Sequence, residues 1–313
     1  MKRISLILIV CLLACMFPGM AFADYSYEGG SNTYTAIGDS ICAGFAQLDY
    51  EYIKGFDMME NIENSPRMCY ARLVGDVTAS RVYNLGKCGC DSGELLDILT
   101  GKDSIYSSVY KEHIAQSSLI SVGIGSNDMI MATAHSILKC IGEDFSEMTN
   151  QEVLAIVEPL LTGNIPGIIN SLELLKGIRL SPEQIKAVQL ALSDESMTAV
   201  MEKAYEAFCI NYPEILDKIH EINPTATLII LNYYNPYKQA KFKWNGISYN
   251  TQDIIQETID KMNEYTLNYS REKGYLYADV SKTLTNIIDP HPSAIGHFQI
   301  ASKIIGLLYK NNI

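Results

Sequence analysis

The chain has 313 residues and is acidic, because 36 Asp and Glu residues outnumber 24 Lys and Arg residues and give a formal net charge of −12 at pH 7. Without a basic excess to neutralise phosphates, a role in binding nucleic acid is not expected. The length is ample for a full hydrophobic core, and it fits one large domain or one domain with an insertion.

The first 23 residues have the pattern of a secretory signal peptide. Lys2 and Arg3 precede an apolar stretch over residues 4–20, and Ala21-Phe22-Ala23 has the small-x-small form of a cleavage site. Cleavage after Ala23 would leave residues 24–313, with a net charge of −14 once the two basic residues are removed. We therefore predict a secreted, extracellular protein.

This leader has two other interpretations. A membrane anchor would need roughly 20 uninterrupted apolar residues, whereas Pro18 and Gly19 interrupt this run. No stable membrane span is therefore expected after cleavage. Lipid attachment at Cys15 would instead leave a lipid-anchored surface protein, although Leu13 before Ala14 is bulkier than such sites usually carry.

Six cysteines lie outside the leader: Cys42, Cys69, Cys88, Cys90, Cys140 and Cys209. An even number in an exported chain favours disulfides, and buried thiols are the alternative. A zinc site is not expected, because one residue instead of two separates Cys88 from Cys90 and no His is near them. Cys140 and Cys209 stand at the two ends of a long helical segment, so we predict a disulfide between them.

Segments rich in β-forming residues alternate with segments of helical periodicity. Strands are expected at residues 34–37, 82–85, 119–124, 226–231 and 275–280. Helices are expected at residues 66–78, 92–99, 251–271 and 293–309. The alternation predicts an α/β fold, a three-layer sandwich with a mostly parallel five-stranded sheet.

A helical insertion is expected at about residues 140–222. The pattern from residue 130 to residue 222 is mostly helical, with breaks at Gly163, Pro166 and Pro182. This segment is too long for a simple crossover between strands. It is either a lid over the strand ends or a structural buttress, and the sequence leaves both open.

Two glycine-containing segments directly follow the first two strands. Gly38-Asp39-Ser40 could present the Ser40 hydroxyl on a tight turn, although such a tripeptide is also common in ordinary turns and helix caps. In the segment Asn84 to Gly89, glycine lets the backbone approach a ligand closely, and its N–H can stabilise an oxyanion.

Two further segments carry an amide and an imidazole. Gly125-Ser126-Asn127-Asp128 follows the third strand, where Asn127 is either an amide donor or a helix cap. Asp289-Pro290-His291-Pro292 precedes the last helix, and the flanking prolines hold His291 rigidly. In open α/β sheets, reactive groups gather beyond the carboxyl ends of the strands, so we expect these side chains to meet.

Together the four segments resemble the SGNH (GDSL-type) hydrolase family, whose name states its Ser, Gly, Asn and His. The resemblance covers the chain from the first strand to the last helix, apart from the insertion, and implies a flavodoxin-like SGNH hydrolase domain over residues 24–313. It implies that Ser40 is the nucleophile and His291 its base. It also implies an oxyanion hole formed by the backbone N–H groups of Ser40 and Gly89 and the amide of Asn127.

Within the glycine motif, the family's Asn is followed five residues later by the donor glycine, which selects Gly89 over Gly86. The positions of Cys88 and Cys140 look most like the family's secreted esterase and phospholipase branch. The family usually places its acid three residues before the histidine, where this chain has Ile288.

Asp289 stands two residues before His291, and either its carboxylate or a backbone carbonyl would orient the imidazole. Asp279 is a more distant alternative for the acid. The other histidines are expected on the surface or in packing positions, because no metal-ligand spacing links them. They are His113, His135, His220 and His297.

The resemblance implies a secreted serine esterase that hydrolyses lipid-like or short acyl esters through an acyl-enzyme, as a monomer and without cofactor or metal. A glycan O-deacetylase of the same fold and a non-catalytic binding module are the alternatives. An α/β-hydrolase lipase would need Gly-x-Ser-x-Gly, which does not surround Ser40. The aromatic-rich segment from Tyr233 to Trp244 either lines the acyl or sugar pocket or forms a packed surface loop.

Overall fold

The computed structural model describes residues 32–47, 62–142, 179–236, 242–244, 247–286 and 290–313, together with Met148 and Val153. The predicted signal peptide, the Cys15 alternative and Asp289 therefore lie outside the described residues. Within the described residues, no helix combines the length and the apolar character needed to cross a membrane.

A five-stranded sheet, all of whose strands are parallel, runs through the fold in the order β2-β1-β3-β4-β7. The strands are β1 (Thr33–Gly38), β2 (Arg81–Gly86), β3 (Leu119–Gly123), β4 (Thr227–Leu231) and β7 (Leu276–Ala278). Gly38 is in register with Gly86 on one side and Gly123 on the other, so three strands end at the same level. The predicted parallel sheet is confirmed.

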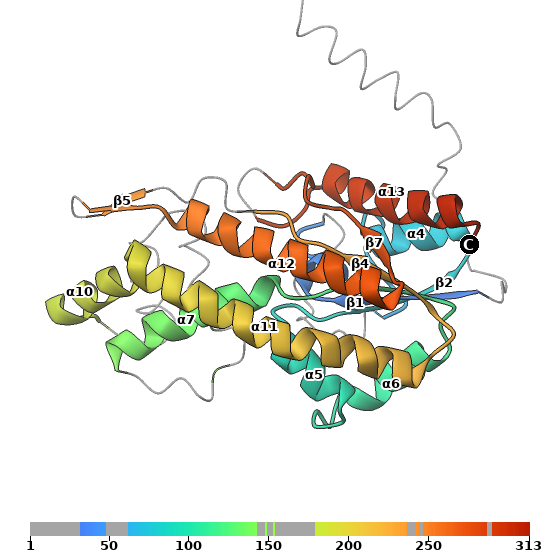
Figure 1. Ribbon diagram of the computed structural model, residues 1–313, viewed down its shortest axis with the longest axis horizontal. Helices are drawn as coiled ribbons and strands as arrows, with labels where there is room; N and C mark the ends of the chain where they lie inside the picture. The colour runs from blue at the N-terminus through green and yellow to red at the C-terminus, as the bar shows by residue number, and fades with distance from the viewer. Residues whose placement is uncertain are drawn as a thin grey trace, which may run out of the picture. The chain divides into compact units, whose positions relative to one another are not determined.

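Helices cover both faces of this sheet, which makes the predicted three-layer sandwich (Figure 1). One layer consists of α4 (Tyr70–Thr78) and α13 (Ala294–Asn311), and these two helices pack against each other. The other layer contains α5 (Ser92–Leu99), α6 (Ser107–Ala115), α7 (Ser126–Ile141), α11 (Asp194–Ile222) and α12 (Thr251–Lys273). Helix α6 has no counterpart among the helices expected from the sequence.

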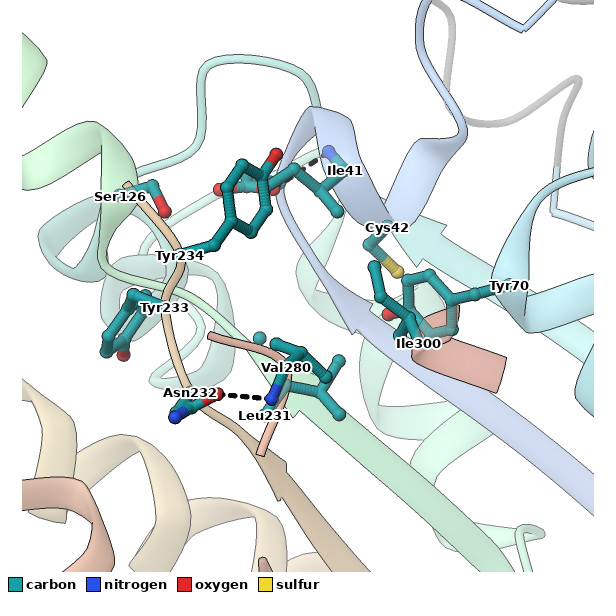
Figure 2. Close-up of a pocket in the computed structure, with 12 residues that line it drawn as sticks. Ile41, Cys42, Tyr70, Ser126, Leu231, Asn232, Tyr233, Tyr234, Val280 and Ile300 are labelled. Carbon is teal, nitrogen blue, oxygen red and sulfur yellow. Dashed lines mark hydrogen bonds between the residues drawn. The ribbon is translucent and has the colours of Figure 1, made fainter. Parts of the chain in front are cut away.

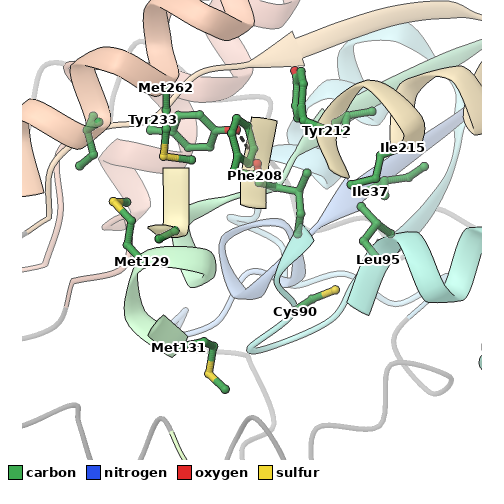
Figure 3. Close-up of a cluster of buried hydrophobic side chains, with 14 of the residues drawn as sticks. Ile37, Cys90, Leu95, Met129, Met131, Phe208, Tyr212, Ile215, Tyr233 and Met262 are labelled. Carbon is green, nitrogen blue, oxygen red and sulfur yellow. Dashed lines mark hydrogen bonds between the residues drawn. The ribbon is translucent and has the colours of Figure 1, made fainter. Parts of the chain in front are cut away.

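The alternation of side chains along the strands explains why there are two cores. Tyr34 and Ala36 of β1 belong to the core under α4 and α13, whereas Ile37 belongs to the core under the larger helical layer. Because successive strand residues point to opposite faces, a strand buried on both faces must be apolar throughout. Figure 3 shows the larger core, to which Ile37 of β1 and the α11 residues Phe208 and Tyr212 all belong.

Part of the predicted insertion is described, as α10 (Pro182–Ala191) and α11. Helix α7 ends at Ile141 before Gly142, which adopts the left-handed conformation that favours glycine (φ 77°). Ser181 and Gln184 form a reciprocal capping box at the start of α10. Helix α11 packs against α5, α7 and α12, and whether the insertion also acts as a lid remains a prediction.

Helix α11 continues through Pro213, although proline removes one hydrogen bond of a helix. The carbonyl that loses its donor is that of Cys209, four residues earlier. The hydroxyl of Tyr265, on α12, donates to this oxygen at 3.1 Å. A hydroxyl from the neighbouring helix thus replaces the missing N–H, and the helix does not end at the proline.

The segment after β4 contains a two-stranded antiparallel ladder, in which β5 (Phe242–Trp244) pairs with β6 (Ile247–Tyr249). No strand was expected from the sequence here. Before this ladder, Tyr233 and Tyr234 are buried at the carboxyl end of β4, so the aromatic segment begins inside the fold.

The disulfides favoured by the even cysteine count are not formed. All six cysteines outside the leader are thiols, so the predicted Cys140–Cys209 disulfide is a wrong prediction. Cys140 is exposed near the end of α7. The Cys209 thiol, by contrast, interacts with the Tyr205 side chain one turn earlier on α11. The alternative of buried thiols applies to Cys42, Cys69, Cys88 and Cys90.

Candidate active site

Ser40 is the first residue of the four-residue helix α2 (Ser40–Ala43), directly after β1. The Asp39 carboxylate caps this helix by accepting a hydrogen bond from Ile41 N at 2.9 Å. Gly38 must be glycine, because a Cβ there would stand 2.4 Å from the carbonyl oxygen of Gly123 on the next strand. The sharp passage from strand to helix therefore places Ser40 at the carboxyl edge of the sheet.

His291 lies against Ser40, although the two residues are 251 positions apart in the sequence. The distance between His291 Nε2 and Ser40 Oγ is 2.9 Å, and the Phe45 ring lies 4.6 Å from the imidazole, measured between centroids. The backbone N–H of Asn286 donates to the His291 carbonyl at 3.0 Å. Gln47 Nε2 donates to the Pro292 carbonyl at 3.0 Å, which fixes this segment to the loop after α2.

The glycine motif packs tightly against α2. Asn84 Nδ2 donates to the Cys42 carbonyl at 2.8 Å, and Asn84 Oδ1 accepts from Gly86 N at 2.9 Å. A Cβ on Gly86 would stand 2.2 Å from Ala43 N, so this glycine serves close packing. Gly89 instead has a φ of 78°, in the left-handed region that favours glycine.

Asn127 lies beside the Gly89 segment. It is the second residue of α7, and its Nδ2 donates to the Cys90 carbonyl at 2.9 Å. The preceding Gly125 has a φ of 133°, and a Cβ there would contact the Phe208 ring at 2.7 Å. The tertiary structure therefore brings together the second and third motifs, as it brings together the first and fourth.

Asp128 also connects the segment that contains Asn127 with the segment that follows Gly89. Its Oδ2 accepts from Ser92 N at 2.9 Å, and its Oδ1 accepts from the Ser92 hydroxyl. Asn211 of α11 donates to the Ser92 hydroxyl oxygen at 3.0 Å. Desolvation raises the pKa of Asp128 to about 7, with a smaller contribution from the Asp91 carboxylate. This network was not foreseen from the sequence, where no local signal links Asn211 to Ser92.

Two further carboxylates lie near the site. Burial raises the pKa of Asp39 to about 6, although its hydrogen bond with Ile41 and the proximity of His291 act in the opposite direction. Asp279 accepts hydrogen bonds from Asn232 Nδ2 at 3.0 Å and Ser281 N at 3.1 Å, and the interaction with Ser281 lowers its pKa. The Asp279 carboxylate is therefore hydrogen-bonded to residues near the ends of β4 and β7.

A small pocket lies at the carboxyl edge of the sheet, and Figure 2 shows the residues that line it. Its cavity volume is about 30 Å³. Tyr70 and Ile300 come from α4 and α13, and the other lining residues lie at or just after the carboxyl ends of β1, β3, β4 and β7: Asp39, Ile41, Cys42, Gly123, Ser126, Leu231, Asn232, Tyr233, Tyr234 and Val280. Tyr233 and Tyr234 are thus the part of the aromatic segment that reaches this pocket.

The remaining histidines occupy surface or packing positions. His135 and His220 are exposed and His113 is half-buried. His297 is fully buried, and its Nδ1 accepts a hydrogen bond from Tyr70 N at 3.2 Å. Burial, and to a smaller extent the charge of His291, lowers the pKa of His297 to about 3, so this imidazole is neutral at neutral pH.

No model of a known protein family matches the sequence, and no curated protein matches it. Solved structures do match the fold. A lipase, Lip_vut3, from a goat rumen metagenome is 16% identical, with a TM-score of 0.50 over 89% of this chain and 98% of that one.

Two other solved structures are similar at lower scores. An extracellular lipase from Streptomyces rimosus is 17% identical, with a TM-score of 0.43 over 89% of this chain and 99% of that one. A mutant acetyl-xylooligosaccharide esterase from Geobacillus Stearmophilus is 18% identical, with a TM-score of 0.43 over 90% and 96% of the two chains.

At these identities the likeness concerns the fold alone. The match to the rumen lipase extends over most of both chains. The chain therefore shares the α/β fold of that lipase, a five-stranded parallel sheet between two layers of helices.

Proposed function

We propose that this protein is an exported serine hydrolase that cleaves carboxylic esters, with Ser40 as nucleophile and His291 as general base. The observation that carries the proposal is the 2.9 Å distance between His291 Nε2 and Ser40 Oγ. A serine hydroxyl is a weak nucleophile until an adjacent base accepts its proton, and this distance allows the transfer. The predicted leader, residues 1–23, supports export.

The reaction begins when Ser40 Oγ attacks the ester carbonyl and His291 Nε2 takes the hydroxyl proton. The protonated imidazole then donates this proton to the leaving alcohol oxygen, and an acyl-enzyme remains on Ser40. Water attacks the acyl-enzyme with His291 again as base, which releases the carboxylic acid and restores the serine. Asp289 or a backbone carbonyl orients the imidazole in this proposal.

The oxyanion formed at each attack would be stabilised by the N–H groups of Ser40 and Gly89 and by Asn127 Nδ2. The amide nitrogen of Asn127 carries two hydrogens, and the bond to the Cys90 carbonyl uses one of them. The second hydrogen is therefore available for the substrate oxygen. The hydrogen bonds from Asn127 to the Cys90 carbonyl and from Ser92 to the Asp128 carboxylate hold these donors in place before substrate arrives.

The test is hydrolysis of p-nitrophenyl acetate by the purified protein and its labelling by a fluorophosphonate probe. We expect Ser40→Ala to lose roughly 10⁴-fold or more in kcat/KM and to lose the label. Ser302→Ala, on the outer side of α13, is the matched control and should behave as the wild type. A Ser40→Ala protein that still hydrolyses the ester at the wild-type rate would exclude Ser40 as the nucleophile.

A further inference from the structure

The pocket in Figure 2 is lined by residues that adjoin Ser40 and Asn127 in the sequence and by one that contacts the residue before His291. Asp39 and Ile41, which flank Ser40 in the sequence, both line it, and so does Ser126, which precedes Asn127. Tyr234 also lines it, and the Tyr234 hydroxyl donates to the carbonyl of Pro290, the residue before His291, at 3.2 Å. An ester carbonyl at Ser40 would therefore have this pocket beside it.

The pocket has a half-buried side and a fully buried side. Ile41, Gly123 and Ser126 are half-buried, and Ile41 directly follows Ser40 in the sequence. Three other lining residues belong to the core under α4 and α13 and are 0–1% exposed: Cys42, Tyr70 and Ile300. A group that enters from the half-buried side therefore meets this core.

The pocket walls are largely apolar, with the side chains of Leu231, Val280 and Ile300 on the side opposite Tyr234 and Ser126 (Figure 2). The side-chain amide of Asn232 is engaged elsewhere, since its Oδ1 accepts from Val280 N at 2.6 Å and its Nδ2 donates to Asp279. A pocket whose walls are largely apolar suits a hydrocarbon group better than a sugar or a phosphate.

The size of the pocket limits what it can hold. An apolar cavity of roughly 150 Å³ can hold a benzene molecule, whereas the volume of this pocket is about 30 Å³. The pocket therefore suits a much smaller apolar group, such as the methyl of an acetyl group or the ethyl of a propionyl group.

We infer that this pocket binds the acyl group of the substrate and restricts it to acetyl or propionyl size, so that the natural substrates are short-acyl esters of larger alcohols. The larger alcohol stays outside, because only the small part of the ester fits a pocket of this size. The inference rests on the proposed function. It favours acetylated compounds, including acetylated glycans, over long-chain lipids.

The test measures kcat/KM for p-nitrophenyl acetate, butyrate, hexanoate and octanoate. A poorly fitting chain loses about 1–3 kcal/mol, or roughly 10- to 200-fold, for each group that does not fit. We expect octanoate to be cleaved at least about 100-fold less efficiently than acetate. An octanoate rate equal to the acetate rate would overturn the inference.

Ile300→Ala removes three carbons from the fully buried side of the pocket and should raise the hexanoate-to-acetate ratio of kcat/KM by roughly tenfold. Ile304→Ala is the matched control, because Ile304 is on the same helix and equally buried, but does not line the pocket. The ratio should stay at the wild-type value in Ile304→Ala. An equal rise in both variants would mean that general loosening of α13 causes the effect, and would refute the pocket assignment.

If Ile300→Ala does not fold, Val280→Ala changes the same wall from a different segment and should shift the ratio in the same direction. Failure of the proposed function and failure of the inference are distinguishable. In the first case no ester is cleaved and the fluorophosphonate does not label Ser40, and the inference falls with it. In the second case Ser40 is labelled but long and short acyl esters are cleaved equally.

Discussion

The carboxylate of Asp128 accepts a hydrogen bond from the backbone N–H of Ser92 at 2.9 Å, and this contact joins the segments that carry two of the proposed oxyanion donors. Asp128 follows Asn127, and Ser92 lies three residues after Gly89. The spacing between the two donors therefore depends on a carboxylate that does not itself reach the substrate. Asn211 extends the contact to α11, so the helical segment also supports the site.

Asp128→Asn should lower kcat by roughly tenfold, because an amide can accept from only one of the two Ser92 donors and presents its own NH2 to the other. KM should change much less, since Asp128 acts by positioning the oxyanion donors. Asp97→Asn on α5 is the control: its pairing with Lys102 is exposed, so kcat should not change. Equal losses of kcat in the two variants would contradict the positioning role.

The same variant should alter how stability depends on pH. The folded-state pKa of Asp128 is raised from 3.8 to about 7, so the folded protein binds a proton that the unfolded chain has released over this range. The free energy of unfolding contributed by this group is therefore highest below pH 3.8 and is lost as the pH rises to about 7. In urea unfolding at several pH values, the difference in free energy of unfolding between the wild type and Asp128→Asn should therefore shrink as the pH rises from 4 to 7.

Asn127→Ala should lower kcat for p-nitrophenyl acetate by roughly 100- to 1,000-fold with little change in KM, because the amide would stabilise charge that develops only after Ser40 attacks. The variant also loses the hydrogen bond to the Cys90 carbonyl and should lose about 1 kcal/mol of stability. Urea unfolding separates this loss from the kinetic effect. A kcat within a factor of two of the wild type would remove Asn127 from the oxyanion hole.

His297 should make the protein sensitive to acid. Its folded-state pKa is lowered from 6.5 to about 3, so below pH 6.5 the unfolded chain gains a proton that the folded chain does not. Stability from this group is thus present above pH 6.5 and is lost as the pH falls toward 3. Between pH 7 and pH 4, the Tm of His297→Gln should fall less than that of the wild type.

His220→Gln is the control for this experiment, because His220 is exposed in the last turn of α11. Its Tm should follow the wild-type curve over the same pH range. If the Tm of His297→Gln and that of the wild type fall by the same amount between pH 7 and pH 4, protonation of the buried imidazole is not what destabilises the fold in acid.

The Tyr265 hydroxyl should contribute more to the free energy of unfolding when residue 213 is proline than when it is alanine. Tyr265→Phe leaves the Cys209 carbonyl without its donor and should cost about 1 kcal/mol in urea unfolding. In the Pro213→Ala background, the backbone N–H of Ala can donate to this carbonyl, and the same change should cost less. Identical costs in the two backgrounds would refute the compensation.

Sequence reasoning located the five strands of the parallel sheet well, because a buried strand depends on local information. A buried parallel strand requires a continuous run of apolar residues, and the run at residues 226–231 contains β4. Gly38 must lack a Cβ because it packs against the Gly123 carbonyl, and Gly89 has a positive φ. Both requirements are visible in the sequence as glycines. By contrast, α6 has a weak apolar periodicity and was not anticipated, and the disulfide prediction failed because a count of cysteines contains no distances.

The sequence by itself determined the alternation of the five sheet strands with helices, and it predicted the end of the sheet where Ser40, Asn127 and His291 would gather, since parallel strands all end on one side. Only the tertiary structure decided the contacts between distant residues: Asn211 with Ser92, 119 positions apart, and Tyr265 with Cys209, 56 positions apart. The size of the pocket likewise depends on how α4 and α13 pack at its fully buried side. Such contacts are set by packing between elements, which no local pattern of residues encodes.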